Sequence, residues 1–295
     1  MSVDSAVSTA DAPPALVLRS RPSLLRRYSR NPFAVAAMLF LAVVILAAAL
    51  APVITSYDPN RIVMGATLLP PSPAHWLGTD ESGRDEFARV LYGARISLTI
   101  GVVAMLLSVI LGTALGALAG VFGGLIDALT MRLTDAMLSI PIFFFLLTVL
   151  AVFGSAVSTI IIAIGLSSWM TAARVVRAEV LRTVNLDYVV AARALGAGGW
   201  RIVLLHLLPS AVPSMLVAST IGVGQAILTE SALSYLGVGV QPPIASWGNM
   251  LSNAQNYFFP APFLAIWPGM MILLTVLSFN FIGDSARDTL SPYQN

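Results

Sequence analysis

The chain has 295 residues, of which 57% are hydrophobic and only 10% are charged. Soluble domains carry about 25% charged residues, so this composition excludes a water-soluble globular protein and predicts an all-α integral membrane protein. The sequence contains no cysteine, which excludes disulfides and thiolate metal sites, and its two histidines, His75 and His206, lie too far apart to suggest a metal cluster. All 16 basic residues are arginine. The lack of lysine excludes a Walker A phosphate-binding loop, which requires Gly-Lys-Ser or Gly-Lys-Thr.

The N-terminal segment 1–32 is polar and carries several arginines just before the first apolar run. That run, 33–55, is longer than the apolar region of a signal peptide. We therefore expect an uncleaved first transmembrane helix rather than a cleaved leader. Basic residues are retained on the cytoplasmic side of membranes, so the tail is predicted to be cytoplasmic, and membrane topology explains the arginines without a nucleic-acid partner.

Five further apolar runs reach about 20 residues, the length that crosses a hydrocarbon core. They occupy residues 97–121, 130–154, 157–178, 211–235 and 261–283, which predicts six transmembrane helices in all. This path makes 56–96 an extracytoplasmic loop, 97–284 a five-helix core and 285–295 a cytoplasmic C-terminal tail. The predicted cytoplasmic segments then hold 12 of the 16 arginines, in agreement with the positive-inside rule.

Two local patterns bear on how these helices pack. Gly112, Gly116 and Gly120 are four residues apart, so they share one helix face and allow another backbone to approach closely. Both ordinary tight packing and a seam that slides fit this pattern. Pro141 lies inside the third run, where it predicts a kink.

Ionisable residues near or within the apolar runs are costly in a membrane and call for partners. Arg132 and Asp135 are three residues apart and predict an ion pair on one helix face. Glu230 lies near the outer end of the fifth run. Its carboxylate is expected either to face a water-filled pathway or to pack against another helix.

The predicted cytoplasmic segment 187–209 is the most distinctive part of the chain. Asp187 is a favourable N-cap for a helix beginning at Tyr188. Gly196 and the following glycines are expected to stop that helix and reverse the chain. A second helix is expected to run from about Trp200 to Pro209, where the chain should turn into the fifth apolar run. Several alanines keep the first helix slim enough to enter a groove on another protein.

These residues resemble a known family. The pattern Ala191-Ala192, Gly196, Ile202 and Leu208-Pro209 is similar to the "EAA" coupling loop of bacterial ABC importer permeases. Motifs of the second permease of dipeptide and oligopeptide importers also occur in order: Trp76-Leu77-Gly78-Thr79-Asp80, Gly83-Arg84-Asp85, Gly93-Ala94-Arg95-Ile96-Ser97-Leu98, Leu233-Ser234-Tyr235-Leu236-Gly237-Val238-Gly239, Gln241-Pro242-Pro243, Trp247-Gly248, Phe279-Asn280-Phe281, Gly283-Asp284 and Arg287-Asp288. The resemblance covers about residues 30–292.

The resemblance implies a type I ABC importer permease fold with a cytoplasmic coupling helix, in the bacterial inner membrane with both termini cytoplasmic. It implies a transport subunit that is not an enzyme and holds no cofactor, with ATP and Mg bound by partner ATPase subunits. The implied partners are a second homologous permease, two ATPase subunits, an extracytoplasmic substrate-binding protein and membrane lipid. Peptides are the first expectation for the cargo, while nickel chelates, glutathione and haem remain open.

Residue by residue, the resemblance implies that the ATPase-coupling residues are Asp187, Tyr188, Val190, Ala191, Ala192, Arg193, Leu195, Gly196, Ile202 and Pro209. The family's glutamate falls at Val190, which would be the third helical position behind an Asp187 N-cap, where a glutamate completes a capping box. The resemblance also implies a docking role for the outer loop, for which Asp80, Arg84 and Asp85 are candidates. Glu230 is a candidate for the transport pathway.

An ion-coupled secondary transporter is the main alternative to an ATP-driven importer. Such transporters usually show internal repeats and binding residues near the bilayer midplane. Neither feature is evident in this sequence, in which most charges cluster at the ends of the apolar runs.

Overall fold

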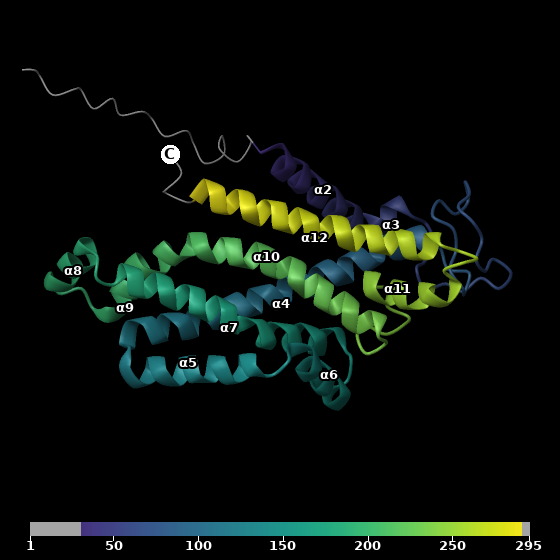
Figure 1. Cartoon of the computed structure of the whole chain (residues 1–295). Coiled ribbons are helices and arrows are strands. Elements are labelled where there is room, and N and C mark those ends of the chain that lie inside the picture. Colours follow the sequence, from purple (N-terminus) through teal and green to yellow (C-terminus); the bar gives the residue numbers. More distant parts are fainter. Residues whose placement is uncertain (1–30, 291–295) are drawn as a thin grey trace, which may run out of the picture.

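The computed structural model describes residues 31–290 as a bundle of long helices (Figure 1). The described part contains no strand, only one isolated bridge between Thr79 and Asp85. The helices are α2 (Pro32–Ala49), α3 (Ala51–Ile54), α4 (Glu86–Phe122), α5 (Gly124–Ser139), α6 (Ile142–Phe153), α7 (Val157–Thr183), α8 (Asp187–Ala194), α9 (Gly199–Ile202), a π-helical turn (Val203–Leu207), α10 (Leu208–Tyr235), α11 (Trp247–Ala254), a 3-10 turn (Gln255–Tyr257) and α12 (Phe263–Leu290).

The glycine stripe lies in the contact between α4 and α7. A Cβ atom added at Gly112 would lie 2.5 Å from the Cβ of Ala172, and one added at Gly120 would lie 2.7 Å from Cγ1 of Val180. A Cβ at Gly116 would collide with the carbonyl oxygen of Ala173. The expected close approach of another backbone is therefore confirmed, and α7 is the partner.

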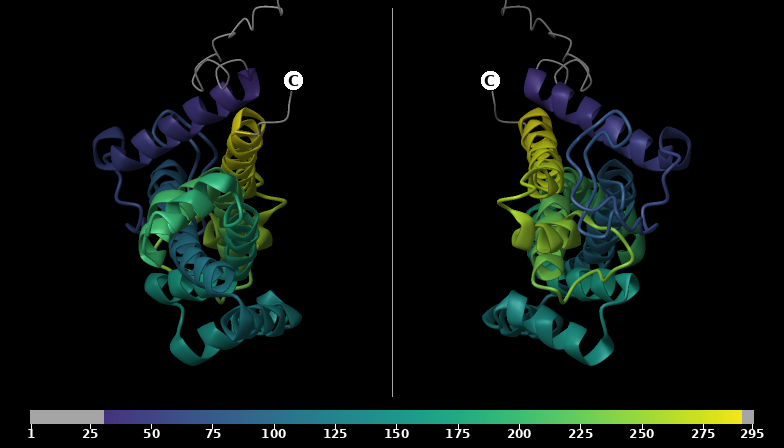
Figure 2. Two further views of the ribbon diagram at one scale, coloured as in Figure 1. Left: turned by 90° about the vertical axis from the view of Figure 1, so that its left-hand side faces the viewer. Right: turned by 90° about the vertical axis from the view of Figure 1, so that its right-hand side faces the viewer.

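The other long helices surround this pair. Figure 2 shows α2 on one side of the bundle and the α5–α6 pair on the opposite side, with α4, α7, α10 and α12 between them.

The start of α2 is capped by Asn31, whose side chain accepts hydrogen bonds from the amides of Phe33 and Ala34. Pro32 occupies the first helical position. Both residue types are favoured at these positions of a helix start. Five helices are long and apolar enough to span a membrane, or six if the bent α5–α6 pair counts as one span.

That bent pair occupies the predicted third span and bends at the predicted position, Pro141. α5 ends at Ser139, α6 begins at Ile142, and their axes differ by 85°. Pro141 supplies no backbone N–H, and the residue before a proline is driven out of the helical region. Ile140 accordingly has extended backbone angles, φ −84 and ψ 125. The predicted kink at Pro141 is therefore a complete break between two helices.

The predicted ion pair between Arg132 and Asp135 is also wrong. Asp135 pairs instead with Arg174 of α7, with Oδ1 2.5 Å from Nη2. Asp127 accepts two hydrogen bonds from Arg177, at 2.5 and 2.6 Å. α7 lies beside α5, and its arginines reach across where sequence spacing could suggest only a partner on the same helix. Two cross-helix ion pairs thus tie α5 to α7.

The bulk added by a side chain at Gly116 should weaken the bundle. We predict that Gly116→Leu lowers the stability of the purified protein by about 3 kcal/mol, the upper part of the range for overpacked sites, because the new side chain would collide with the backbone of α7. Ala114→Leu adds comparable bulk at an exposed position of the same helix and should change stability little. Thermal unfolding in detergent, followed by tryptophan fluorescence, measures both variants. Equal melting temperatures of the two variants would contradict a stabilising role for the glycine contact between α4 and α7.

Candidate functional site

The segment between α7 and α10 forms an elbow, defined here as residues 184–207, beyond the end of the bundle (Figure 1). It contains α8, a glycine-containing turn, α9 and the π-helical turn. The N-terminal end of α2 and the C-terminal end of α12 lie toward this same end of the bundle, whereas α11 and the loop before α4 lie at the other end.

The base of the elbow is anchored in the bundle by buried aliphatic side chains. Val189 of α8 is 0% exposed, and Ile202 of α9 is 4% exposed. Both belong to one apolar cluster with Val176, Val180 and Leu207, which come from the end of α7 and the start of the α10 region. The elbow is therefore packed against the two helices that it joins and does not hang from them as a loose loop.

The outer surface of the elbow is apolar and uncovered. Leu195 is 89% exposed, Val190 50% and Tyr188 49%. Ala191 and Arg193 are also exposed, and Ala192 is half-buried. The structure thus brings most of the predicted coupling residues to one exposed end of the protein, although Ile202 serves as an anchor under that surface. The sequence prediction missed Val189 as an anchor. The available signal was a pair of valines, Val189 and Val190, in an otherwise alanine-rich helix, of which only Val189 is buried.

The start of α8 differs from its prediction by one residue. Leu186, not Asp187, is the N-cap, and Asp187 is the first helical residue without a side-chain capping bond. Val190 is therefore the fourth helical position and not the third. The capping-box account of the missing glutamate consequently does not apply. Asp187 still lies in the first helical turn, where a carboxylate interacts favourably with the helix dipole.

The end of α8 agrees with its prediction. Gly196 has φ +84, a backbone conformation that glycine adopts without strain. The amide of Gly196 donates to the carbonyl of Arg193, and the amide of Ala197 donates to the carbonyl of Ala192, both at 3.0 Å. These two bonds form a Schellman motif, so Gly196 both ends α8 and turns the chain toward α9.

Pro209 does not turn the chain, contrary to its prediction. α9, the π-helical turn and α10 form one helical run from Gly199 to Tyr235, and Pro209 lies in the first turn of α10. A π-helical turn widens the backbone hydrogen-bonding ladder. The turn at Val203–Leu207 directly precedes α10, whose second residue is Pro209, so the helix accommodates the missing N–H without a break.

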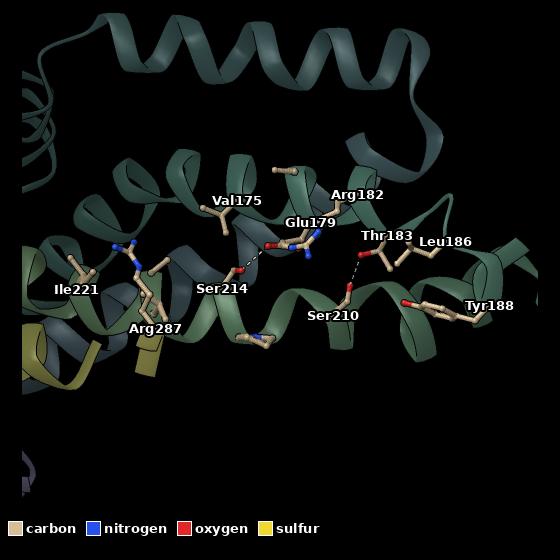
Figure 3. Close-up of a pocket in the computed structure, with 14 residues that line it drawn as sticks. Val175, Glu179, Arg182, Thr183, Leu186, Tyr188, Ser210, Ser214, Ile221 and Arg287 are labelled. Carbon is tan, nitrogen blue, oxygen red and sulfur yellow. Dashed lines mark hydrogen bonds and ion pairs between the residues drawn. The ribbon is translucent and has the colours of Figure 1, made fainter. Parts of the chain in front are cut away.

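An open cavity of about 740 Å³ lies along the contact between α7 and α10, next to the elbow (Figure 3). Leu186 and Tyr188 of the elbow form part of its wall. Two polar contacts connect its sides: the hydroxyl of Ser214 donates to Oε1 of Glu179 at 2.8 Å, and the hydroxyls of Thr183 and Ser210 lie 3.1 Å apart. α12 contributes Arg287 and α7 contributes Arg182, so the wall is polar as well as apolar.

Glu230 does not face a pathway in this structure. It is 0% exposed, and its carboxylate accepts hydrogen bonds from Ser234 at 2.8 Å and from Ser97 of α4 at 3.2 Å. The hydroxyl oxygen of Ser97 also accepts from the amide of Trp247, at 3.2 Å. Of the two expectations for Glu230, packing against another helix is therefore the one that the structure supports: it links α10, α4 and α11.

The predicted docking residues of the outer loop are buried, so the structure corrects their role. Asp80, Arg84 and Asp85 are 3%, 6% and 4% exposed. Arg84 Nε donates to Asp80 at 2.6 Å, while Asp85 caps α4 by accepting from the amide of Ala88 at 2.8 Å and also lies 2.8 Å from His75 Nδ1. Buried charges need such partners. These residues fold the loop onto the start of α4, and their own side chains are buried away from any partner.

Within residues 31–290, no group of three or more His, Cys, Asp or Glu side chains is arranged to hold a metal ion. The polar lining of the cavity consists of hydroxyls, one carboxylate and two guanidinium groups.

Comparison with known proteins agrees with this architecture. Residues 112–293 match the family described as binding-protein-dependent transport system inner membrane component, and residues 23–71 match the N-terminal transmembrane domain of oligopeptide transport permease C. The fold resembles the inward-facing MetNI methionine ABC transporter, with a TM-score of 0.57 and 19% identity over 69% of this chain and 97% of that chain.

Curated relatives match over most of their length. The glutathione transport system permease protein GsiD of Pectobacterium atrosepticum is 40% identical over 90% of this chain and 89% of the relative. The oligopeptide transport system permease protein OppC of Bacillus subtilis is 38% identical over 90% of this chain and 87% of the relative. Family match, relatives and fold agree, and the chain belongs to the binding-protein-dependent transport system inner membrane components, as an ABC importer permease subunit of the type I fold.

Proposed function

We propose that this chain forms half of the translocation pathway of an ATP-driven peptide importer, and that its elbow docks on a separate ATPase subunit. The observation that carries this proposal is the contrast within the elbow. Val189 and Ile202 anchor its base, while Tyr188, Val190 and Leu195 leave an apolar outer surface uncovered. Exposed apolar patches commonly mark protein interaction sites, and a short helix in a groove is a recurrent recognition mode.

Coupling requires that a displacement of the elbow reaches the membrane helices. Val189 packs in the same cluster as Val176 and Val180 of α7 and Leu207 next to α10. Closely packed interiors transmit strain. A partner that pulls on α8 therefore acts on both walls of the cavity at once, since the elbow lies between α7 and α10 and lines that cavity with Leu186 and Tyr188.

The energy source must come from outside the chain. The sequence has no lysine and therefore no Walker A loop, so ATP and Mg are assigned to two partner ATPase subunits. A second homologous permease completes the pathway. The start of α2 and the end of α12 lie toward the elbow end of the bundle, which supports cytoplasmic termini on the ATPase side of the inner membrane.

An extracytoplasmic binding protein is the proposed partner at the opposite end. Its contacts cannot be the buried charges of the outer loop. Large apolar side chains are exposed there instead: Met64 at 94%, Trp76 at 62% and Phe259 at 96%. Aromatic and methionine side chains are enriched in protein interfaces, and these three replace Asp80, Arg84 and Asp85 as candidate contacts.

The cargo is proposed by relationship. Relatives named for glutathione transport are 40% to 42% identical to this chain, and relatives named for oligopeptide and dipeptide transport are 38% identical. Glutathione is itself a modified tripeptide, so peptides are the class that covers these relatives. Nickel chelates and haem remain alternatives for the same type of importer.

Co-purification tests the proposal most directly. Purified from its native membrane with a tag on this chain, the protein should bring down a second permease and two ATPase subunits, and ATP hydrolysis should belong to that complex. The tagged chain alone should hydrolyse no ATP. Uptake driven by a proton or sodium gradient in vesicles that contain only this chain would contradict the proposal.

The exposed leucine at the end of α8 should be needed for docking. Burying a leucine side chain stabilises a complex by roughly 1.5–3 kcal/mol, so we predict that Leu195→Asp reduces the co-purified ATPase by about tenfold or more. Leu195→Met keeps an apolar side chain of similar size and should retain the ATPase. If both variants bring down as much ATPase as the unmodified chain, the outer surface of the elbow is not the docking surface.

The conformation of Gly196 should be needed for coupling. A β-branched residue is strained at φ +84, by about 1–2 kcal/mol, so Gly196→Val should displace the link between α8 and α9. We predict that uptake by the reconstituted importer falls while ATP hydrolysis continues. Gly198→Ala is the matched control, because Gly198 has φ −64 and open space around an added Cβ. Normal uptake by the Gly196→Val importer would show that the Schellman turn does not transmit the movement.

A further inference from the structure

The cavity between α7 and α10 carries opposite charges at different places on its wall. Figure 3 shows Glu179 and Arg182 near its middle and Arg287, from α12, toward the end away from Tyr188. The side chains of Glu179 and Arg287 project into the space between the two helices. Charged side chains from separate helices thus converge on one space of about 740 Å³.

The guanidinium of Arg287 is free to bind an anion. Asp284 and Asp288 are close to it in sequence, yet no carboxylate of residues 31–290 lies within ion-pair distance of Arg287. An arginine presents a planar fork of donors that fits a carboxylate in two parallel hydrogen bonds. The end of the cavity at Arg287 is therefore suited to a ligand carboxylate.

The carboxylate of Glu179 is only partly engaged. Oε1 accepts the hydrogen bond from Ser214, and Oε2 lies 3.6 Å from Nη1 of Arg182, whose side chain is 63% exposed. Exposed ion pairs of this kind contribute at most about 1 kcal/mol, so a ligand cation can compete for Oε2. An ammonium group has three donors, which Glu179 and the nearby hydroxyl of Ser210 could accept.

We propose that this cavity binds a small zwitterion on its way to the cytoplasmic end, with its carboxylate on Arg287 and its ammonium group on Glu179. Ligand cavities in proteins run from about 300 to about 1,000 Å³, and a short peptide fits this range. The inference rests on the proposed function, because it takes the ligand to be the cargo. It goes further by assigning recognition of the two cargo termini to named residues of the permease.

Binding to the complete importer, embedded in lipid nanodiscs without its binding protein, tests the site itself. The probes are dialanine, its C-terminal amide and its N-acetyl derivative, which remove one charge at a time. A hydrogen bond to a charged group corresponds to roughly a tenfold or greater change in affinity. The unmodified importer should therefore bind dialanine about tenfold more tightly than either derivative.

The variants separate the two ends of the ligand. Arg287→Gln should abolish the preference for dialanine over the amide while keeping the preference over the N-acetyl form, and Glu179→Gln should do the reverse. Asp288→Asn is the matched control, because Asp288 adjoins Arg287 but does not line the cavity, and it should keep both preferences. Absence of dialanine binding, equal affinities for the three probes, or unchanged preferences in Arg287→Gln would each overturn the proposal.

A second arm distinguishes cargo from a zwitterion that arrives from the cytoplasm. In proteoliposomes with the binding protein outside, Arg287→Gln should slow dialanine uptake, while stimulation of ATP hydrolysis by the binding protein stays normal. A change in hydrolysis caused by dialanine on the ATPase face alone, with uptake unaffected by Arg287→Gln, would overturn the assignment to cargo. Because the Gly196→Val and co-purification experiments do not depend on this cavity, its failure would leave the proposed function intact.

Discussion

The close contact between α4 and α7 is the constraint on which the rest of the bundle depends. Lipid offers no hydrophobic drive for one helix to pack against another, so tight van der Waals contact must hold them together. Three glycines provide it by letting the backbone of α4 approach the side chains and carbonyls of α7. α10 and the elbow are then built on the end of α7, and the position of α8 follows from this contact.

Hydrogen bonds and ion pairs connect the helices and loops of the bundle outside the glycine contact between α4 and α7. Inside it, Glu230 joins α10 to α4 through serine hydroxyls. On the side of the bundle formed by α5, Asp127 and Asp135 hold α5 against α7 through two arginines. At the end of the bundle opposite the elbow, Asp80 and Arg84 fold the loop before α4. Unpaired charges are costly in such surroundings, so each pair restricts the arrangement of the helices that it connects.

The elbow and the cavity are adjacent and share residues. The buried side chains of the elbow, Val189 and Ile202, pack against α7 and the start of the α10 region. Leu186 and Tyr188 of the elbow line the cavity beside those helices. A protein that binds the exposed end of α8 is therefore in contact, through one layer of side chains, with the wall that the cargo is proposed to pass. The proposed docking surface and the proposed cargo site therefore lie next to one another.

Local features were determined by the sequence itself. Apolar runs of membrane length, the glycine stripe, and the stop at Gly196 all depend on residue type and spacing over a few turns, and each was predicted without tertiary information. The helix boundary at Leu186 was predicted only to within one residue, because a side-chain cap and a backbone cap differ by small energies. The break at Pro141 was located but not its size, since the angle depends on what packs on either side.

Tertiary structure alone decided the partners of the charged residues. Spacing suggested Arg132 for Asp135, but the neighbouring helix supplied Arg174. For Glu230 the sequence left a pathway position and packing against another helix both open, and only the fold decided for packing. Asp80 and Arg84 were expected on a docking surface, whereas folding buries them against each other around a turn. Electrostatic energy depends on distances in space, and a linear sequence specifies those distances only within one helix.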